Sequence, residues 1–144
     1  MAEAASGTIV VTGSRGRLGR ALLATSVRPI HGWDRPLLDL DDPASAARLV
    51  QRDAPALVIH AAAMTDVDAA ARDPESAIRR NAESTETLAR ACREADAGLV
   101  VISTNEVFDG QRSDGQGYRE DDETAPINAY GRSKLAAERA ARAA

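Results

Sequence analysis

Tyr130 and Lys134 stand four positions apart near the carboxyl end of this chain of 144 residues. On a helix, positions i and i+4 share a face, with their Cβ atoms about 5–6 Å apart. A tyrosine hydroxyl has an ordinary pKa of about 10, and a neighbouring ammonium group favours the phenolate and lowers that pKa. The spacing therefore suits an acid that gives a proton to a developing alkoxide. A surface Tyr–Lys pair without chemistry is the alternative, because this spacing is common by chance.

Three glycines, Gly13, Gly16 and Gly19, form a loop of the pattern G-x-x-G-x-x-G. The loop lies between residues 8–12, a β-branched run typical of a buried strand, and a predicted helix at residues 17–24. The first glycine permits a tight turn, the second lets the backbone approach a pyrophosphate, and the third lets the helix pack close to the strand. Free N–H groups at the helix start favour phosphates. A flexible turn is the alternative, but this position favours a dinucleotide site.

Two neighbouring residues leave the choice of cofactor open. Asp34 ends a predicted strand at residues 29–33 and lies about twenty residues beyond Gly13, where a carboxylate accepts the adenosine ribose hydroxyls of NADH. Arg35 follows it and could instead meet the 2′-phosphate of NADPH. A solvated loop pair is the alternative to both interpretations.

Thr104 and Asn81 are further polar candidates. Thr104 lies just beyond a predicted strand at residues 99–103, where its hydroxyl could bond a keto oxygen of a substrate or satisfy its own backbone. Asn81 needs hydrogen-bond partners if it is buried, and a structural role and a role near the site are both open. It belongs to a predicted inward stripe on a long helix: Ala77, Asn81, Thr85, Leu88 and Cys92. Cys92 is interpreted as core, and His60 as a packing group at a strand end.

The elements that must position these residues alternate along the chain. This alternation predicts an α/β fold, a three-layer Rossmann-type parallel sheet with right-handed crossovers, whose ligands lie at the carboxyl ends of the strands. Leu18, Ala21 and Leu22 are expected on one side of the first helix, and Asp42 is expected to cap the second. Residues 109–128 are a polar stretch of a length that is usually functional or disordered. The predicted strands are 8–12, 29–33, 56–60 and 99–103, and the predicted helices 17–24, 42–52, 74–95 and from 129 onward.

Composition excludes several classes of function. The net charge of −4 gives no electrostatic reason to bind nucleic acid or an anionic membrane, although Arg15, Arg17 and Arg20 cluster around the glycine loop. Cys92 is the only cysteine, which favours a reducing compartment, and the two histidines lack metal-ligand spacing. No apolar run approaches the roughly 18 residues of a membrane helix, and residues 1–7 lack the features of a signal peptide. A cytoplasmic protein without a metal site is expected.

The motifs in combination are recognisable. The glycine loop, IHAAA at 59–63, ST at 103–104, VFDG at 107–110 and YGRSK at 130–134 follow one another in that order. Together they resemble extended short-chain dehydrogenase/reductases, and most closely the dTDP-4-dehydrorhamnose reductase family. Residues 65–68, residues 118–122, Pro126 and Asn128 are also similar to that family.

The resemblance implies that NADPH or NADH gives a hydride to C4 of a dTDP-4-keto-6-deoxy sugar. Tyr130 would be the general acid, Lys134 its partner and a ligand of the cofactor ribose, and Thr104 the group that orients the carbonyl. The oxidised nicotinamide, a cation, would lower the tyrosine pKa further. The implied substrate residues are Thr65, Thr104, Asn105 and Glu106. Besides Tyr130 and Lys134, the cofactor residues are Gly13, Arg15, Gly16, Arg17, Leu18, Gly19, Asp34, Arg35, Asp39, Leu40, Ala61, Ala62 and Ala63.

The chain departs from the family in two ways. Asn105-Glu106 stands where members often carry Asp-Tyr, which leaves the particular sugar open. Members are also about twice as long, so residues 1–144 correspond to an NAD(P)-binding Rossmann domain that stops after the Tyr-x-x-x-Lys helix, without the carboxyl-terminal substrate lobe. A homo-oligomer or a carboxyl-terminal polypeptide would complete it. The alternatives are a non-catalytic regulatory module that binds nucleotides, an inactive truncated fragment, or an epimerase or dehydratase that uses Glu106.

Overall fold

The computed structural model describes residues 7–144 and contains one parallel sheet of four strands in the order β2-β1-β3-β4. The expectation that the amino terminus holds no signal peptide falls mainly on residues 1–6, outside the described part. The sheet confirms the predicted α/β class, and each predicted strand has a counterpart. The strands are β1 (Ile9–Thr12), β2 (Ile30–Trp33), β3 (Leu57–His60) and β4 (Gly98–Val101).

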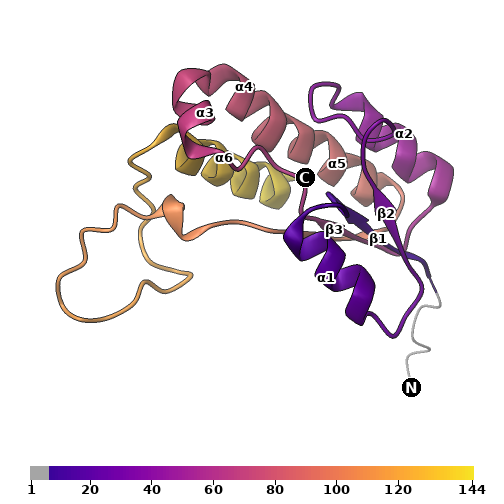
Figure 1. Ribbon diagram of the computed structural model, residues 1–144, viewed down its shortest axis with the longest axis horizontal. Helices are drawn as coiled ribbons and strands as arrows, with labels where there is room; N and C mark the ends of the chain where they lie inside the picture. Colours follow the sequence, from indigo (N-terminus) through magenta and orange to yellow (C-terminus); the bar gives the residue numbers. More distant parts are fainter. Residues whose placement is uncertain (1–6) are drawn as a thin grey trace.

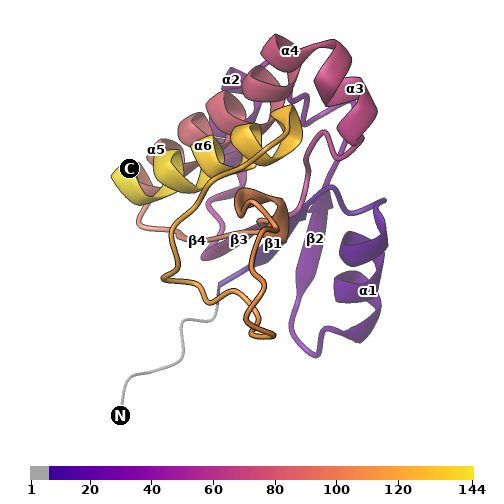
Figure 2. The ribbon, with the colours of Figure 1, turned by 90° about the vertical axis from the view of Figure 1, so that its left-hand side faces the viewer.

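Helices cover the two faces of the sheet unequally. Figure 1 shows α1 (Arg17–Thr25) on one face and the other described α-helices gathered on the opposite face, and Figure 2 shows the same arrangement edge-on. The predicted long helix is found as two α-helical stretches joined by a π-helical turn, while α3 was not predicted. The helices of the crowded face are α2 (Ala44–Asp53), α3 (Val67–Arg72), α4 (Pro74–Ile78), the π turn η1 (Arg79–Glu83), α5 (Ser84–Glu94) and α6 (Ala129–Ala143).

The main core lies between the crowded helices and the sheet. Val10 and Val58 from neighbouring strands pack with Leu49, Val50 and Leu88 from α2 and α5. β-Branched residues suit such strands because they pack well against a pleated surface. The predicted inward stripe of the long helix is confirmed, since all five of its members are buried: Ala77, Asn81, Thr85, Leu88 and Cys92.

One local expectation was wrong, the Asp42 cap of α2. The side of α1 that carries Leu18, Ala21 and Leu22 is partly open: Leu18 is 41% exposed and Ala21 is exposed as well, because no other described helix lies beside α1 to cover that side. Asp42 does not cap α2: Pro43 stands at the cap position without a side-chain bond, and the Asp42 carboxylate pairs with Arg48 at 2.5 Å instead.

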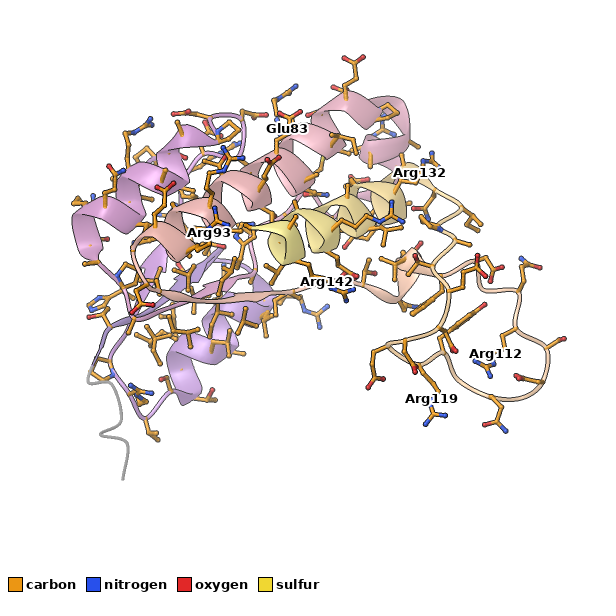
Figure 3. The ribbon with its side chains drawn as sticks, turned by 180° about the vertical axis from the view of Figure 1, so that it is seen from behind. Glu83, Arg93, Arg112, Arg119, Arg132 and Arg142 are labelled. Atoms are coloured by element: carbon orange, nitrogen blue, oxygen red, sulfur yellow. The ribbon has the colours of Figure 1, made fainter. Side chains whose placement is uncertain are left out.

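β4 is an edge strand of the described sheet, and its apolar residues are only partly covered. Val100 is 46% exposed, and Figure 3 shows β4 in front of the other strands with Arg142 of α6 close by. A groove of about 530 Å³ runs between β4 and α6. Its apolar lining consists of Leu99, Val101, Val107, Phe108 and Ala141.

The polar stretch at residues 109–128 contains no helix or strand, and Figure 3 shows it standing away from the sheet with Arg112 and Arg119 on it. Two side-chain contacts hold it: the Tyr118 ring stacks on Phe108, just before the stretch, with centroids 4.5 Å apart, and Arg112 pairs with Asp122 at 2.6 Å within it. Among residues 7–144, no helix has both the length and the apolar character needed to cross a membrane.

Candidate functional site

The glycine loop joins β1 to α1 through close backbone contacts. The Gly13 N–H donates to the Trp33 carbonyl at 3.0 Å, and the Gly16 N–H donates to the Gly13 carbonyl at 2.9 Å. Gly13 has a φ of +68°, and a Cβ added there would lie 2.9 Å from the backbone of Ala62. A Cβ added at Gly19 would overlap the Gly13 carbonyl oxygen and the backbone of Ser14. Side chains are thus excluded where the loop, the helix and the segment after β3 meet, which leaves the backbone N–H groups at the start of α1 accessible to phosphates.

A cleft of about 270 Å³ opens beside this loop, at the carboxyl ends of β1, β2 and β3. It lies where the strand order reverses about β1, which is where open α/β sheets bind their ligands. Six lining residues were predicted as cofactor residues: Gly13, Asp34, Arg35, Leu40, Ala62 and Ala63. Four more were not singled out as cofactor residues: Trp33, Leu38, Met64 and Arg80.

Other predicted cofactor residues lie outside the lining of this cleft. Arg15 and Arg17 are exposed beside the glycine loop. The Asp39 carboxylate accepts from Arg35 at 3.4 Å and from the Asp41 N–H at 3.0 Å. Gly16, Leu18, Gly19 and Ala61 do not line the cleft either.

Asp34 connects the end of β2 to the glycine loop. Its carboxylate accepts a hydrogen bond from the Ser14 hydroxyl and another from the Arg15 backbone N–H at 3.5 Å. Arg35 points its Nη2 to Asp39 at 3.4 Å and to Asp41 at 3.6 Å. An acidic and a basic group, Asp34 and Arg35, therefore both line the cleft.

His60 and Thr12 form a buried pair beneath the cleft. His60 Nδ1 lies 2.8 Å from Thr12 Oγ1, which also accepts the Ala62 N–H at 3.0 Å. Burial, and secondarily the charge of Lys134, lowers the pKa of His60 from 6.5 to about 3. This geometry agrees with the interpretation of His60 as a packing group, because a ring that stays neutral holds the two strand ends together.

This burial predicts a pH-dependent stability. Below pH 6.5 the unfolded chain protonates His60, whereas the folded chain does not until about pH 3, so stability is lost as the pH falls through this window. From pH 6.5 to about pH 5 the free energy of unfolding should fall by about 2 kcal/mol from this group. Urea unfolding of the chain and of His60→Gln at both pH values measures it. An equal pH dependence in both proteins would contradict the prediction.

Tyr130 and Lys134 lie on α6, whose start is fixed by Asn128, the side chain of which accepts the Gly131 N–H at 2.7 Å. Lys134 is buried and donates from Nζ to the Ile102 carbonyl at 2.6 Å, and burial lowers the pKa of its ammonium group. Burial also raises the pKa of the Tyr130 hydroxyl, with a hydrogen bond from Thr104 acting in the opposite direction. The expected lowering of the tyrosine pKa by Lys134 is therefore wrong for this arrangement, because the lysine is bound to the end of β4.

Asn81 links two segments of the site. Its Oδ1 accepts the Met64 N–H at 2.7 Å, and its Nδ2 donates to the Met64 carbonyl at 3.0 Å and to Ser133 Oγ at 2.9 Å. The Ser133 hydroxyl in turn donates to the Tyr130 carbonyl at 2.7 Å. Asn81 lies in the π turn, so a single side-chain amide from this turn bonds both the segment after β3 and the helix that carries Tyr130.

The predicted substrate residues lie around the end of β4, apart from Thr65, which is exposed after β3. Asn105 is exposed, and Glu106 accepts from Asn128 Nδ2 at 2.5 Å. The Thr104 hydroxyl accepts the Glu106 N–H at 3.2 Å, and Thr104 lines the groove beside β4 rather than the cleft beside the glycine loop. Among residues 7–144, no three His, Cys, Asp or Glu side chains gather as metal ligands.

Comparison with known proteins gives one family. The model of the RmlD substrate binding domain matches residues 7–144. A dTDP-4-dehydrorhamnose reductase of Mycobacterium tuberculosis is 41% identical over 143 residues, which cover 94% of this chain and 46% of that protein. The chain thus spans about half the length of such relatives.

Solved structures agree with the sequence comparison. The dTDP-4-dehydrorhamnose reductase of Bacillus anthracis in complex with NADP superimposes with a TM-score of 0.90 at 35% identity, covering 98% of this chain and 51% of that one. RMD of Pseudomonas aeruginosa complexed with NADPH gives a TM-score of 0.75 at 33% identity, covering 92% and 46%. The family match spans the glycine loop, the cleft and the Tyr130 helix alike, and the chain belongs to the RmlD substrate binding domain family.

Proposed function

We propose that this chain is the cofactor-binding half of an NADPH- or NADH-dependent reductase that acts on the 4-keto group of a dTDP-4-keto-6-deoxy sugar. One observation carries the proposal. The cleft beside the glycine loop and the group of Thr104, Tyr130 and Lys134 both lie at the carboxyl end of the same parallel sheet. A cofactor in the cleft would extend from the end of β2 toward Tyr130.

The residues of the chain fit such a cofactor. The loop excludes a Cβ at Gly13 and at Gly19, so its backbone is open to a pyrophosphate, and the cleft beside it offers Asp34 and Arg35 to the adenosine ribose. Lys134, whose Nζ is held at the Ile102 carbonyl, would bind the ribose next to the nicotinamide. When bound, the cofactor supplies a hydride to the carbonyl carbon.

Side chains of this chain would supply the proton that the reduction needs. The Tyr130 hydroxyl gives its proton to the carbonyl oxygen as negative charge develops there. Thr104 donates a hydrogen bond to the same oxygen and so orients it. The raised pKa of Tyr130 keeps its hydroxyl protonated before the reaction, as an acid requires.

The choice of substrate is supported by the relatives. Three of them, from Mycobacterium tuberculosis, Mycolicibacterium smegmatis and Streptomyces griseus, are each 41% identical to this chain and are called dTDP-4-dehydrorhamnose reductase. A dTDP-sugar is therefore the substrate that we propose.

Activity would need a substrate lobe beyond the described chain. We propose that a carboxyl-terminal polypeptide, or a second subunit, packs against β4. The exposed Val100 and the groove between β4 and α6 support this, because an edge strand with apolar residues is a site for a further strand.

Titration with NADPH and with NADH, followed by nicotinamide fluorescence, tests the cofactor half of the proposal. We expect saturable binding, and we expect Gly16→Asp to abolish it, because the added carboxylate would lie among the N–H groups that meet the pyrophosphate. A matched variant, Gly117→Asp, lies in the 109–128 stretch, where an added Cβ has no neighbour within 4 Å, and should bind normally. A folded chain that binds neither cofactor would contradict the proposal.

A further inference from the structure

Three arginines converge on one carboxylate at the edge of the cleft beside the glycine loop. Arg80 donates to Asp41 from Nε at 2.7 Å and from Nη2 at 2.6 Å. Arg79 and Arg35 approach the same carboxylate at 3.3 and 3.6 Å. Arg80 and Arg35 line the cleft, whereas Arg79 does not. The cluster therefore presents two of its three cations to whatever the cleft binds.

Asp41 holds the Arg80 side chain in place but bonds only some of its N–H donors. A guanidinium group carries five N–H donors, and Asp41 takes two of them through Nε and Nη2. The remaining three, two of them on Nη1, have no hydrogen-bond partner among residues 7–144. An anion in the cleft can therefore bond Arg80 while the ion pair with Asp41 stays intact. Guanidinium groups held in this way suit phosphate because their planar donors match its oxygens.

The position of the cluster indicates which phosphate it meets. The ribose of the adenosine lies beside the residue that ends β2 in Rossmann-type sheets, which is Asp34 here. The Asp34 carboxylate already accepts from the Ser14 hydroxyl and the Arg15 N–H. Two cations, Arg35 and Arg80, line the cleft against this one carboxylate. Asp39 and Asp41 pair with these cations, so the preference for a phosphate over a hydroxyl group comes from the unbonded guanidinium donors of Arg80 and not from the net charge.

We propose that Arg80 is a specificity-determining residue that, together with Arg35, binds the 2′-phosphate on the adenosine ribose and selects NADPH over NADH. Asp41 is the positioning residue that directs Arg80 into the cleft. The inference rests on the proposed function, because it requires the cofactor to occupy this cleft.

Dissociation constants of the 144-residue chain for NADPH and NADH, from nicotinamide fluorescence, test the inference. We expect NADPH to bind more tightly than NADH. Arg80→Gln should raise the dissociation constant for NADPH about tenfold and change that for NADH by less than about twofold. Arg79→Gln is the matched control, since it removes a neighbouring cation that pairs with Asp41 but does not line the cleft, and it should leave both constants within about twofold. Added salt should weaken the binding of NADPH more than the binding of NADH in the unsubstituted chain. This difference between the two cofactors should be smaller in Arg80→Gln.

The outcomes separate the inference from the function on which it rests. Equal losses of affinity for NADPH and for NADH in Arg80→Gln would mean that the residue only supports the fold, and would overturn the inference. Equal affinities of the unsubstituted chain for both cofactors would overturn it as well, while leaving the proposed cofactor site intact. Binding of neither cofactor by the folded chain would overturn both.

Discussion

Replacement of Tyr130 by phenylalanine should lower the rate of keto-sugar reduction by at least about a hundredfold, because it removes one oxygen and with it the proton that the product alcohol needs. The affinity for NADPH should change little, since the ring and the Lys134–Ile102 hydrogen bond remain. The assay follows NADPH oxidation by a dTDP-4-keto-6-deoxy sugar. It uses the chain joined after residue 144 to the remaining half of its Mycobacterium tuberculosis relative, which supplies a substrate lobe.

The chain offers a matched control in its other tyrosine. Tyr118 lies in the 109–128 stretch, where its hydroxyl donates to Asp109 at 2.5 Å, so Tyr118→Phe also deletes one hydrogen-bonded phenol oxygen. We expect this variant to keep its rate within a few-fold. If Tyr130→Phe retained the rate of the parent protein, another group would be the acid and the proposed role of Tyr130 would be wrong.

Replacement of Gly19 by alanine should destabilise the fold by about 3 kcal/mol. In an ordinary helix the same change stabilises by about 1 kcal/mol, because alanine is the better helix former. Here the added methyl group would overlap the Gly13 carbonyl oxygen and Ser14, so either α1 or the loop must shift. Urea unfolding followed by circular dichroism measures the change, and NADPH binding should weaken in parallel because the same backbone forms the phosphate site.

Gly117→Ala is the control for this prediction. Gly117 has no atom within 4 Å of an added Cβ and its φ lies outside the left-handed region, so the substitution should change the free energy of unfolding by less than about 0.5 kcal/mol. A stabilised Gly19→Ala variant would show that α1 is free to move outward, and would contradict the close packing of loop and helix.

The parts of the fold that follow from short-range pattern could be predicted from the sequence. The run at residues 8–12 and the stripe that includes Asn81 and Leu88 have the periods of a buried strand and a helix face, and both are found. The π turn was not predicted, because one extra residue in a turn leaves a helical period almost unchanged. α3 was missed although Asp66, which caps it by accepting the Ala69 N–H at 2.8 Å, was visible as a signal.

The site was predictable where side chains form a motif and not where backbone or distant residues act. The glycine loop and the Tyr130–Lys134 pair have recognisable spacings. The Ile102 group that binds Lys134 is a backbone carbonyl, which any residue type provides, so the sequence does not indicate it. Arg80 was missed because its place beside the cleft depends on its ion pair with Asp41, which lies 39 residues earlier in the segment after β2. Its position directly before Asn81 was the one signal that could have found it.

The exposed edge of β4 also determines how the chain behaves at high concentration. An edge strand presents a row of backbone N–H and C=O groups, and two chains that meet at such edges pair into a continuous sheet. β4 carries Val100 outward without a charged side chain in Gly98–Val101 to oppose pairing. Aggregation of the described chain should therefore begin at this strand, and a lysine at position 100 should delay the onset of turbidity when the protein is concentrated.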